Sequence, residues 1–135
     1  MDFNSIIDLL SALPTWAWVL AAFAMLFALG DRGLWDYEAK FPSAKGVGRG
    51  EVELECYKKR GAHVELHLEL EPDYRDAEVE VFFRGTCILH AAEQKRERER
   101  LYFREPLSVG EPREGELVSV RLNRREVFSG PLIKD

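Results

Sequence analysis

Three histidines are the residues of this 135-residue chain whose type points most directly to metal chemistry. His63 and His67 lie four residues apart, a spacing that puts two ligands on one face of a helix. The residues around them alternate as in a strand, where the two side chains are about 13 Å apart and cannot share an ion. His90 stands alone, and no CxxC or HExxH motif occurs. We therefore expect no metal site and no cofactor.

The carboxylates show no spacing that is typical of acid–base catalysis. Glu51, Glu53 and Glu55 alternate with apolar residues, which places them on the solvated face of a strand. The sequence contains neither a nucleophile elbow nor a glycine-rich phosphate loop. A serine or cysteine nucleophile assisted by histidine and aspartate stays open from composition alone. The pattern nevertheless favours a chain that catalyses no reaction.

Two cysteines are too few for a disulfide scaffold. Cys56 and Cys87 occupy inward or near-inward positions of expected strands, so we predict reduced core residues in a cytoplasmic domain. A Cys56–Cys87 disulfide would indicate the opposite location of the domain.

A cluster of arginines suggests contact with anionic lipid headgroups. The net charge of the whole chain is −5, and no basic groove with interleaved aromatic residues occurs, so nucleic acid is excluded as a partner. One hypothesis is a basic ridge that faces the lipid, and its residues are Arg96, Arg98, Arg100 and Arg104. The alternative is that these arginines pair with glutamates on neighbouring strands.

Apolar and charged residues alternate with a period of two through residues 50–135, which is typical of half-buried strands. The expected strands cover residues 51–56, 64–71, 79–83, 86–91, 98–104, 118–122 and 126–129. Arg84-Gly85 and Asn123-Arg124 mark turns, residues 93–97 an exposed hairpin connection, and residues 106–115 a long loop. The predicted fold is mainly β: a small antiparallel β-sandwich or barrel of about seven strands.

One uncharged run, Leu9–Leu29, precedes this domain. Its length and composition predict a single transmembrane helix over residues 13–30, after a short tail or interfacial turn over residues 1–12. A cleaved signal peptide and a buried core helix are the alternatives, although the first 31 residues lack the Lys or Arg of a signal peptide. Aromatic residues near the two ends are expected at the membrane interface, namely Trp16, Trp18, Trp35 and Tyr37.

The helix also has a face of small residues at four-residue spacing, which allows close helix packing in lipid. This face consists of Ala17, Ala21, Ala24 and Ala28. Residues 31–49, rich in glycine and charge, are interpreted as a linker along the membrane surface. Their cations Arg32, Lys40, Lys45 and Arg49 predict an outer N-terminus and a cytoplasmic C-terminal domain, as in a bacterial inner membrane.

These features together favour a single-pass, non-catalytic accessory or assembly subunit of a larger membrane complex. Its expected partners are other transmembrane helices, the bilayer and anionic headgroups. In outline the arrangement is similar to the H-type subunit of bacterial photosynthetic reaction centres, with an outer N-terminus, one helix and an inner β-rich domain. The alternative is an extracytoplasmic, membrane-tethered module that binds a ligand or envelope component through loops such as residues 106–115.

Overall fold

The computed structural model describes residues 14–135, and for residues 24–29 it describes the backbone alone. The chain divides into two compact units, of which the second begins at Gly33. The described part of the first unit is one helix, α2 (Thr15–Gly30). The second unit, Gly33–Asp135, holds all the described strands.

Helix α2 is shorter than the transmembrane helix that the sequence predicts. Its 16 residues make about 24 Å of helix at 1.5 Å per residue, against the roughly 30 Å of a bilayer's hydrocarbon core. Across residues 14–135, no helix has both the length and the apolar character that crossing a membrane requires. The expected turn over residues 1–12 lies outside the described residues.

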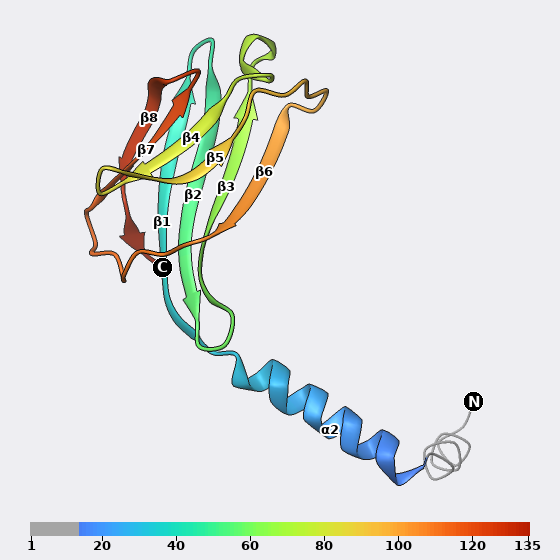
Figure 1. Cartoon of the computed structure of the whole chain (residues 1–135). Coiled ribbons are helices and arrows are strands. Elements are labelled where there is room, and N and C mark those ends of the chain that lie inside the picture. Colours follow the sequence, from blue (N-terminus) through green and yellow to red (C-terminus); the bar gives the residue numbers. More distant parts are fainter. Residues whose placement is uncertain (1–13) are drawn as a thin grey trace. The chain divides into compact units, whose positions relative to one another are not determined.

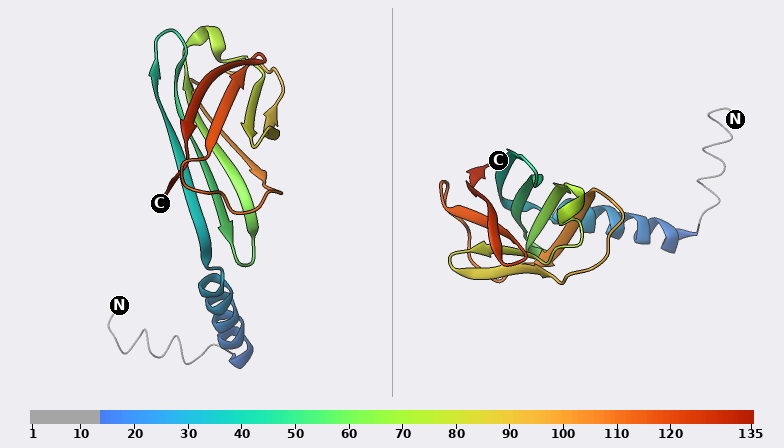
Figure 2. Two further views of the ribbon diagram at one scale, coloured as in Figure 1. Left: turned by 90° about the vertical axis from the view of Figure 1, so that its left-hand side faces the viewer. Right: turned by 90° about the horizontal axis from the view of Figure 1, so that it is seen from above.

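The second unit consists of two antiparallel sheets that face each other as a sandwich (Figures 1 and 2). The five-stranded sheet has the order β6-β3-β2-β1-β9. Its strands are β1 (Gly33–Ala44), β2 (Gly48–Tyr57), β3 (Gly61–Leu70), β6 (Arg100–Pro106) and β9 (Ile133–Lys134). The four-stranded sheet has the order β5-β4-β7-β8, with β4 (Val79–Phe83), β5 (Thr86–Ala91), β7 (Leu117–Leu122) and β8 (Arg125–Pro131). A short 3₁₀ turn, η1 (Pro72–Tyr74), follows β3.

The apolar residues of the alternating pattern form the core between the sheets, as the sequence predicts. Val52, Leu54 and Leu66 of the larger sheet are fully buried, as are Val81 and Val120 of the smaller one. The rings of Phe41 on β1 and Phe128 on β8 stack with their centroids 5.5 Å apart, which joins the two sheets at one side of the core.

Two turns match their sequence signatures. Arg84-Gly85 joins β4 to β5, and Asn123-Arg124 joins β7 to β8. All four residues have positive φ angles, between 52° and 74°. This is the geometry of the two-residue hairpin turn whose twist matches that of its strands.

The sequence misses β1 and β9, so the described residues contain more strands than the expected seven or so. Residues 33–44 fall within the predicted linker but pair with β2 from Gly33 to Ala44. Their alternation was hidden by the glycines around them and by Pro42, which lies at a register shift between Phe41 and Ala44. The expected hairpin over residues 93–97 is also wrong, because β5 and β6 belong to different sheets and the segment crosses between them.

Candidate functional site

The outer face of the five-stranded sheet carries rows of polar side chains that the strand register brings together. Asp36 on β1 pairs with Glu55 on β2, and Glu55 pairs with His63 on β3. In the next row on the same face, Glu53 pairs with Glu65. Like charges directly opposite each other destabilise a sheet. The register therefore brings several carboxylates together, with the imidazole of His63 beside them.

Glu55 and His63 are buried although they point away from the sandwich core. Only 8% of Glu55 and 5% of His63 is exposed. The His63 Nε2 atom lies in contact with a carboxylate oxygen of Glu55. Tyr57 covers the pair: its ring stacks on the imidazole at 5.7 Å between centroids, and its hydroxyl donates to Glu55 Oε2 at 3.2 Å. The guanidinium of Arg60 lies 4.0 Å from the centre of the Tyr57 ring.

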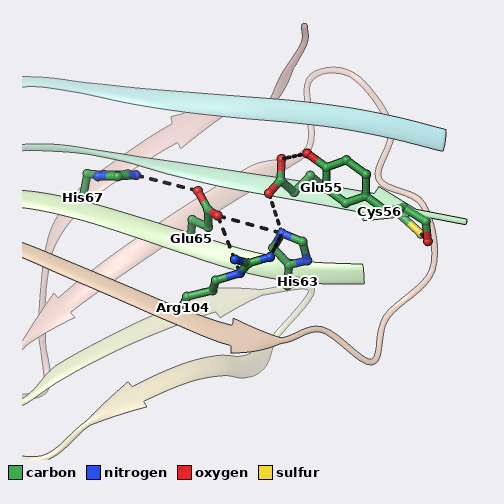
Figure 3. A network of polar contacts seen from close by, with 7 residues as sticks. Glu55, Cys56, His63, Glu65, His67 and Arg104 are labelled. Atoms are coloured by element: carbon green, nitrogen blue, oxygen red, sulfur yellow. Dashed lines mark hydrogen bonds and ion pairs between the residues drawn. The ribbon is translucent and has the colours of Figure 1, made fainter. Parts of the chain in front are cut away.

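Arg104 and Glu65 complete the network on the β6 side (Figure 3). Arg104 Nη2 lies 2.9 Å from His63 Nε2, and its Nε lies 3.7 Å from Glu65 Oε1. The two Glu65 carboxylate oxygens lie 3.8 Å from the Nε2 atoms of His63 and His67 respectively. His63 and His67 thus contact opposite sides of one carboxylate.

Asp36 and Glu53 share a hydrogen bond between their carboxyl groups, which requires a proton on one of them. Burial, the hydrogen bond to Asp36 and the charges of Asp36 and Glu55 raise the pKa of Glu53 from 4.5 to about 8. Burial and the charge of Glu55 also raise the pKa of Asp36, although its hydrogen bond to Glu53 acts in the opposite direction. This end of the network therefore retains a proton at neutral pH.

Glu55 differs from these two neighbours. Burial alone would raise its pKa, but the hydrogen bond with His63 and the charge of His63 outweigh burial, so the pKa of Glu55 lies below its ordinary value. Carboxyl groups with opposite shifts are thus packed side by side. Such an arrangement can hold a proton or a cation between its oxygen atoms.

Two depressions adjoin the network. A cavity of about 250 Å³ is lined by Trp35, Asp36, Glu55 and Tyr57 together with the C-terminal residues 134–135. A groove of about 550 Å³ lies further along the sheet. It is lined in part by Lys40, Arg49, His67 and Tyr102. His67 and Tyr102 are paired residues of β3 and β6, and their ring centroids are 4.8 Å apart.

The four arginines of the predicted basic ridge have different surroundings, and the ridge itself stays a prediction. The guanidinium of Arg96 is half-buried, and its Nη1 donates to the carbonyl oxygens of Arg75 and Ala77 at 2.9 and 2.8 Å. Arg104 is engaged with His63 and Glu65. Arg98 and Arg100 are exposed, and Arg100 lies opposite Glu69 of β3. Pairing with a glutamate on the neighbouring strand therefore describes Arg104. The Glu69 carboxylate opposite Arg100 instead accepts hydrogen bonds from Arg49.

The predicted interfacial aromatics fall into two groups. Trp16 and Trp18 are exposed on α2. Tyr37 is buried in the core, where its hydroxyl donates to Glu111 Oε1 at 3.3 Å, and Trp35 packs half-buried against it. Tyr37 is therefore a core residue and cannot face a membrane surface.

The small-residue face of the helix is described only in part. Ala17 is half-buried and Ala21 is exposed. The side chains of Ala24 and Ala28 lie outside the described residues.

The two cysteines are not bonded to each other, and they differ in exposure. Cys56 is half-buried on β2, whereas Cys87 is exposed on β5. The reason is a register shift in the β4–β5 pairing: Val81 pairs with Leu89 but Phe82 pairs with Cys87, so Ile88 is an extra residue between them. This bulge reverses the alternation that predicts an inward Cys87.

The sequence did not single out Glu55, His63 and Glu65 as neighbours, and the expectation of no metal site stays untested. Alternation does place all three on one face, but it does not say which strands pair or in which register. Within the described residues, two triads have ligand-type atoms within 4.8 Å of one another: Glu55, His63 and Glu65, and Asp36, Glu53 and Glu55.

Comparison of the chain with protein-family models, with curated proteins and with solved structures finds no match.

Proposed function

We propose that this protein is a non-catalytic accessory or assembly subunit of a membrane complex, with its uncharged run Leu9–Leu29 embedded in the bilayer. The observation that carries this proposal is the exposure of large apolar side chains on α2. Trp16, Leu20 and Phe23 are 65%, 59% and 66% exposed. Contiguous apolar surface of this kind indicates a lipid or protein contact.

The construction of the β unit supports the same role. The buried core of this unit is formed mainly by residues of its own two sheets. Two residues, Asp31 and Arg32, connect α2 to β1, so a membrane-embedded helix would hold the sandwich at the membrane surface. Two weak contacts with one complex, through the helix and through the sandwich, would then reinforce each other through effective concentration.

The distribution of cations favours a cytoplasmic sandwich. Residues 1–31 contain no Lys or Arg, whereas Arg32, Lys40, Lys45 and Arg49 follow the apolar run. Cytoplasmic flanks of membrane helices are enriched in these residues. We therefore expect activity from a C-terminal fusion to a reporter that is active only in the cytoplasm.

Membrane fractionation of the full chain tests the association with lipid. We expect the protein to stay in the membrane fraction after an alkaline carbonate wash and the double variant Leu20→Lys, Phe23→Lys to be released. The matched control is Leu117→Lys with Ile133→Lys, which changes two residues that are equally exposed on the β unit (64% and 59%). Release of the unsubstituted chain by the wash would refute membrane association. Release of the control variant together with the helix variant would refute the role of the helix in that association.

The subunit role needs a separate experiment, namely gentle detergent extraction followed by identification of co-purifying proteins. We expect a stable membrane partner, and we expect Ala21→Leu with Ala24→Leu to weaken its recovery because bulk on the small-residue face prevents close helix packing. A protein that is extracted alone and monodisperse would contradict the subunit role while leaving membrane association intact.

The groove beside Tyr102 favours a second candidate, an extracytoplasmic module that binds a ligand. Its volume of about 550 Å³ lies in the range of small-molecule sites. The C-terminal reporter separates the two candidates, because this one requires the sandwich on the outer side of the membrane.

A further inference from the structure

The Glu55–His63–Glu65 triad has the composition of a transition-metal site. The ligand-type atoms of these residues lie within 4.8 Å of one another, two on β3 and one on β2. A histidine nitrogen combined with carboxylate oxygens suits Zn²⁺ and similar first-row cations, whereas Mg²⁺ and Ca²⁺ prefer oxygen alone. The histidine therefore narrows the class of cation.

The burial of the triad is unusual for the outer face of a sheet. Such faces are normally hydrated, yet Glu55 and His63 are more than nine-tenths buried beneath Tyr57. A buried carboxylate has lost its hydration and needs a compensating positive partner. A coordinated cation provides more compensation than the contacts of Glu55 with His63 and with the Tyr57 hydroxyl.

In the metal-free network, hydrogen-bond donors and acceptors are not fully paired. His63 Nε2 faces a carboxylate oxygen of Glu55 and also a guanidinium nitrogen of Arg104. One ring nitrogen either donates or accepts a hydrogen bond, so one of these two contacts is always unmatched. Among the described residues, the buried Oδ1 atom of Asp36 has no hydrogen-bond partner either. The network thus offers more lone pairs than its donors can satisfy.

Arg104 occupies the side of His63 that a metal ion would approach. Its guanidinium is close to both His63 and Glu65, but its side chain is 43% exposed, so it is free to turn outward. The cavity of about 250 Å³ is lined by Asp36 and by Glu55, the one member of the triad that it reaches. Asp36 and Glu53 add negative charge next to the triad.

We propose that Glu55, His63 and Glu65 bind one divalent cation of the Zn²⁺ class, and that the guanidinium of Arg104 competes with it for the same position. His63 binds through Nε2, and Glu55 and Glu65 bind through one carboxylate oxygen each. The Arg104 guanidinium moves away from His63 when the ion enters. This site is independent of the proposed membrane role, because no residue of α2 takes part.

Equilibrium dialysis of the tag-free full chain in mild detergent tests the proposal, with Zn²⁺ as the probe after EDTA treatment. We expect one Zn²⁺ per chain, retained in a hundredfold excess of Mg²⁺. His63→Gln and Glu65→Gln should weaken binding by about tenfold or more, because each removes one ligand. Arg104→Gln should tighten binding about tenfold, because it removes the competing charge.

The matched control is His90→Gln, on the other sheet. This variant should bind Zn²⁺ like the unsubstituted chain. Equal loss in this control would mean adventitious binding to surface histidines and would overturn the proposal. Unchanged binding by a folded His63→Gln variant would do the same. Tightening in Arg104→Gln cannot arise from misfolding, so weaker or unchanged binding in that variant would refute the competition.

Discussion

Glu55 on β2 and His63 on β3 are directly paired residues on the outer face of the larger sheet, and both are buried there. The two side chains contact each other directly. In addition, the Tyr57 hydroxyl donates to Glu55, and Arg104 contacts His63. Removing His63 would take from the buried Glu55 carboxylate the partner that lowers its pKa, although the Tyr57 hydroxyl would still donate to it. The intact pair therefore stabilises the sheet, and loss of one of its members is expected to destabilise it.

His63→Ala is expected to lower the free energy of unfolding by about 2 to 3 kcal/mol in EDTA, because Glu55 loses its partner while remaining buried. Urea denaturation of the full chain measures this change. His67→Ala is the control, since its side chain is 44% exposed, and it should cost less than about 1 kcal/mol. Equal effects of the two substitutions would show that the buried contact between Glu55 and His63 adds nothing to the free energy of unfolding.

Glu53→Gln is expected to stabilise the metal-free protein at pH values above about 4.5. The pKa of Glu53 is about 8 in the fold and 4.5 as its ordinary value, so the native state binds the extra proton between these values. Stability of the unsubstituted chain therefore falls as the pH rises from about 4.5 to about 8, and glutamine removes this loss.

Thermal unfolding in EDTA across this pH range provides the measurement for Glu53→Gln. The gain in Tm should be absent below pH 4, where Glu53 is protonated in both states, and constant above pH 9. A gain that does not vary with pH would contradict the assigned cause.

Gly48→Ala is expected to destabilise the sandwich by more than about 3 kcal/mol or to prevent folding. Gly48 has a φ angle of +133°, and a Cβ atom there would lie 2.0 Å from the carbonyl oxygen of Glu69. Gly110→Ala is the control, because a Cβ atom on Gly110 would meet nothing within 4 Å and the φ angle of this residue is not positive. Soluble yield and Tm of the two variants should differ sharply, and similar values would contradict the close approach of β2 and β3.

Arg96→Ala is expected to cost about 2 kcal/mol, because the guanidinium donates to carbonyl oxygens of Arg75, Ala77 and Ala92. Arg98→Ala, in the exposed part of the same segment, should change stability by less than about 0.5 kcal/mol. Chemical denaturation separates the two. If instead both variants kept full stability and lost binding to anionic liposomes equally, the result would support the basic ridge.

The alternation of apolar and charged residues determined most of the β architecture. Val52 and Leu54 point into the core and Glu51 and Glu53 point away because a strand has a period of two, and this property is local. The same holds for the Asn123-Arg124 turn, whose positive φ angles follow from its place between two strands. The uncharged run Leu9–Leu29 and its flanking charges are likewise read from the sequence alone.

Only the tertiary structure decided which strands are neighbours and in which register. Asp36, Glu55 and His63 come from three strands, and nothing local in the sequence states that they form one row. The bulge that exposes Cys87 and the burial of Tyr37 in the core also depend on distant segments. Pairing is a long-range property, because a shift of one residue moves every side chain of a strand to the other face. The sequence therefore determined the kinds of residues on each face, and the fold decided which of them meet.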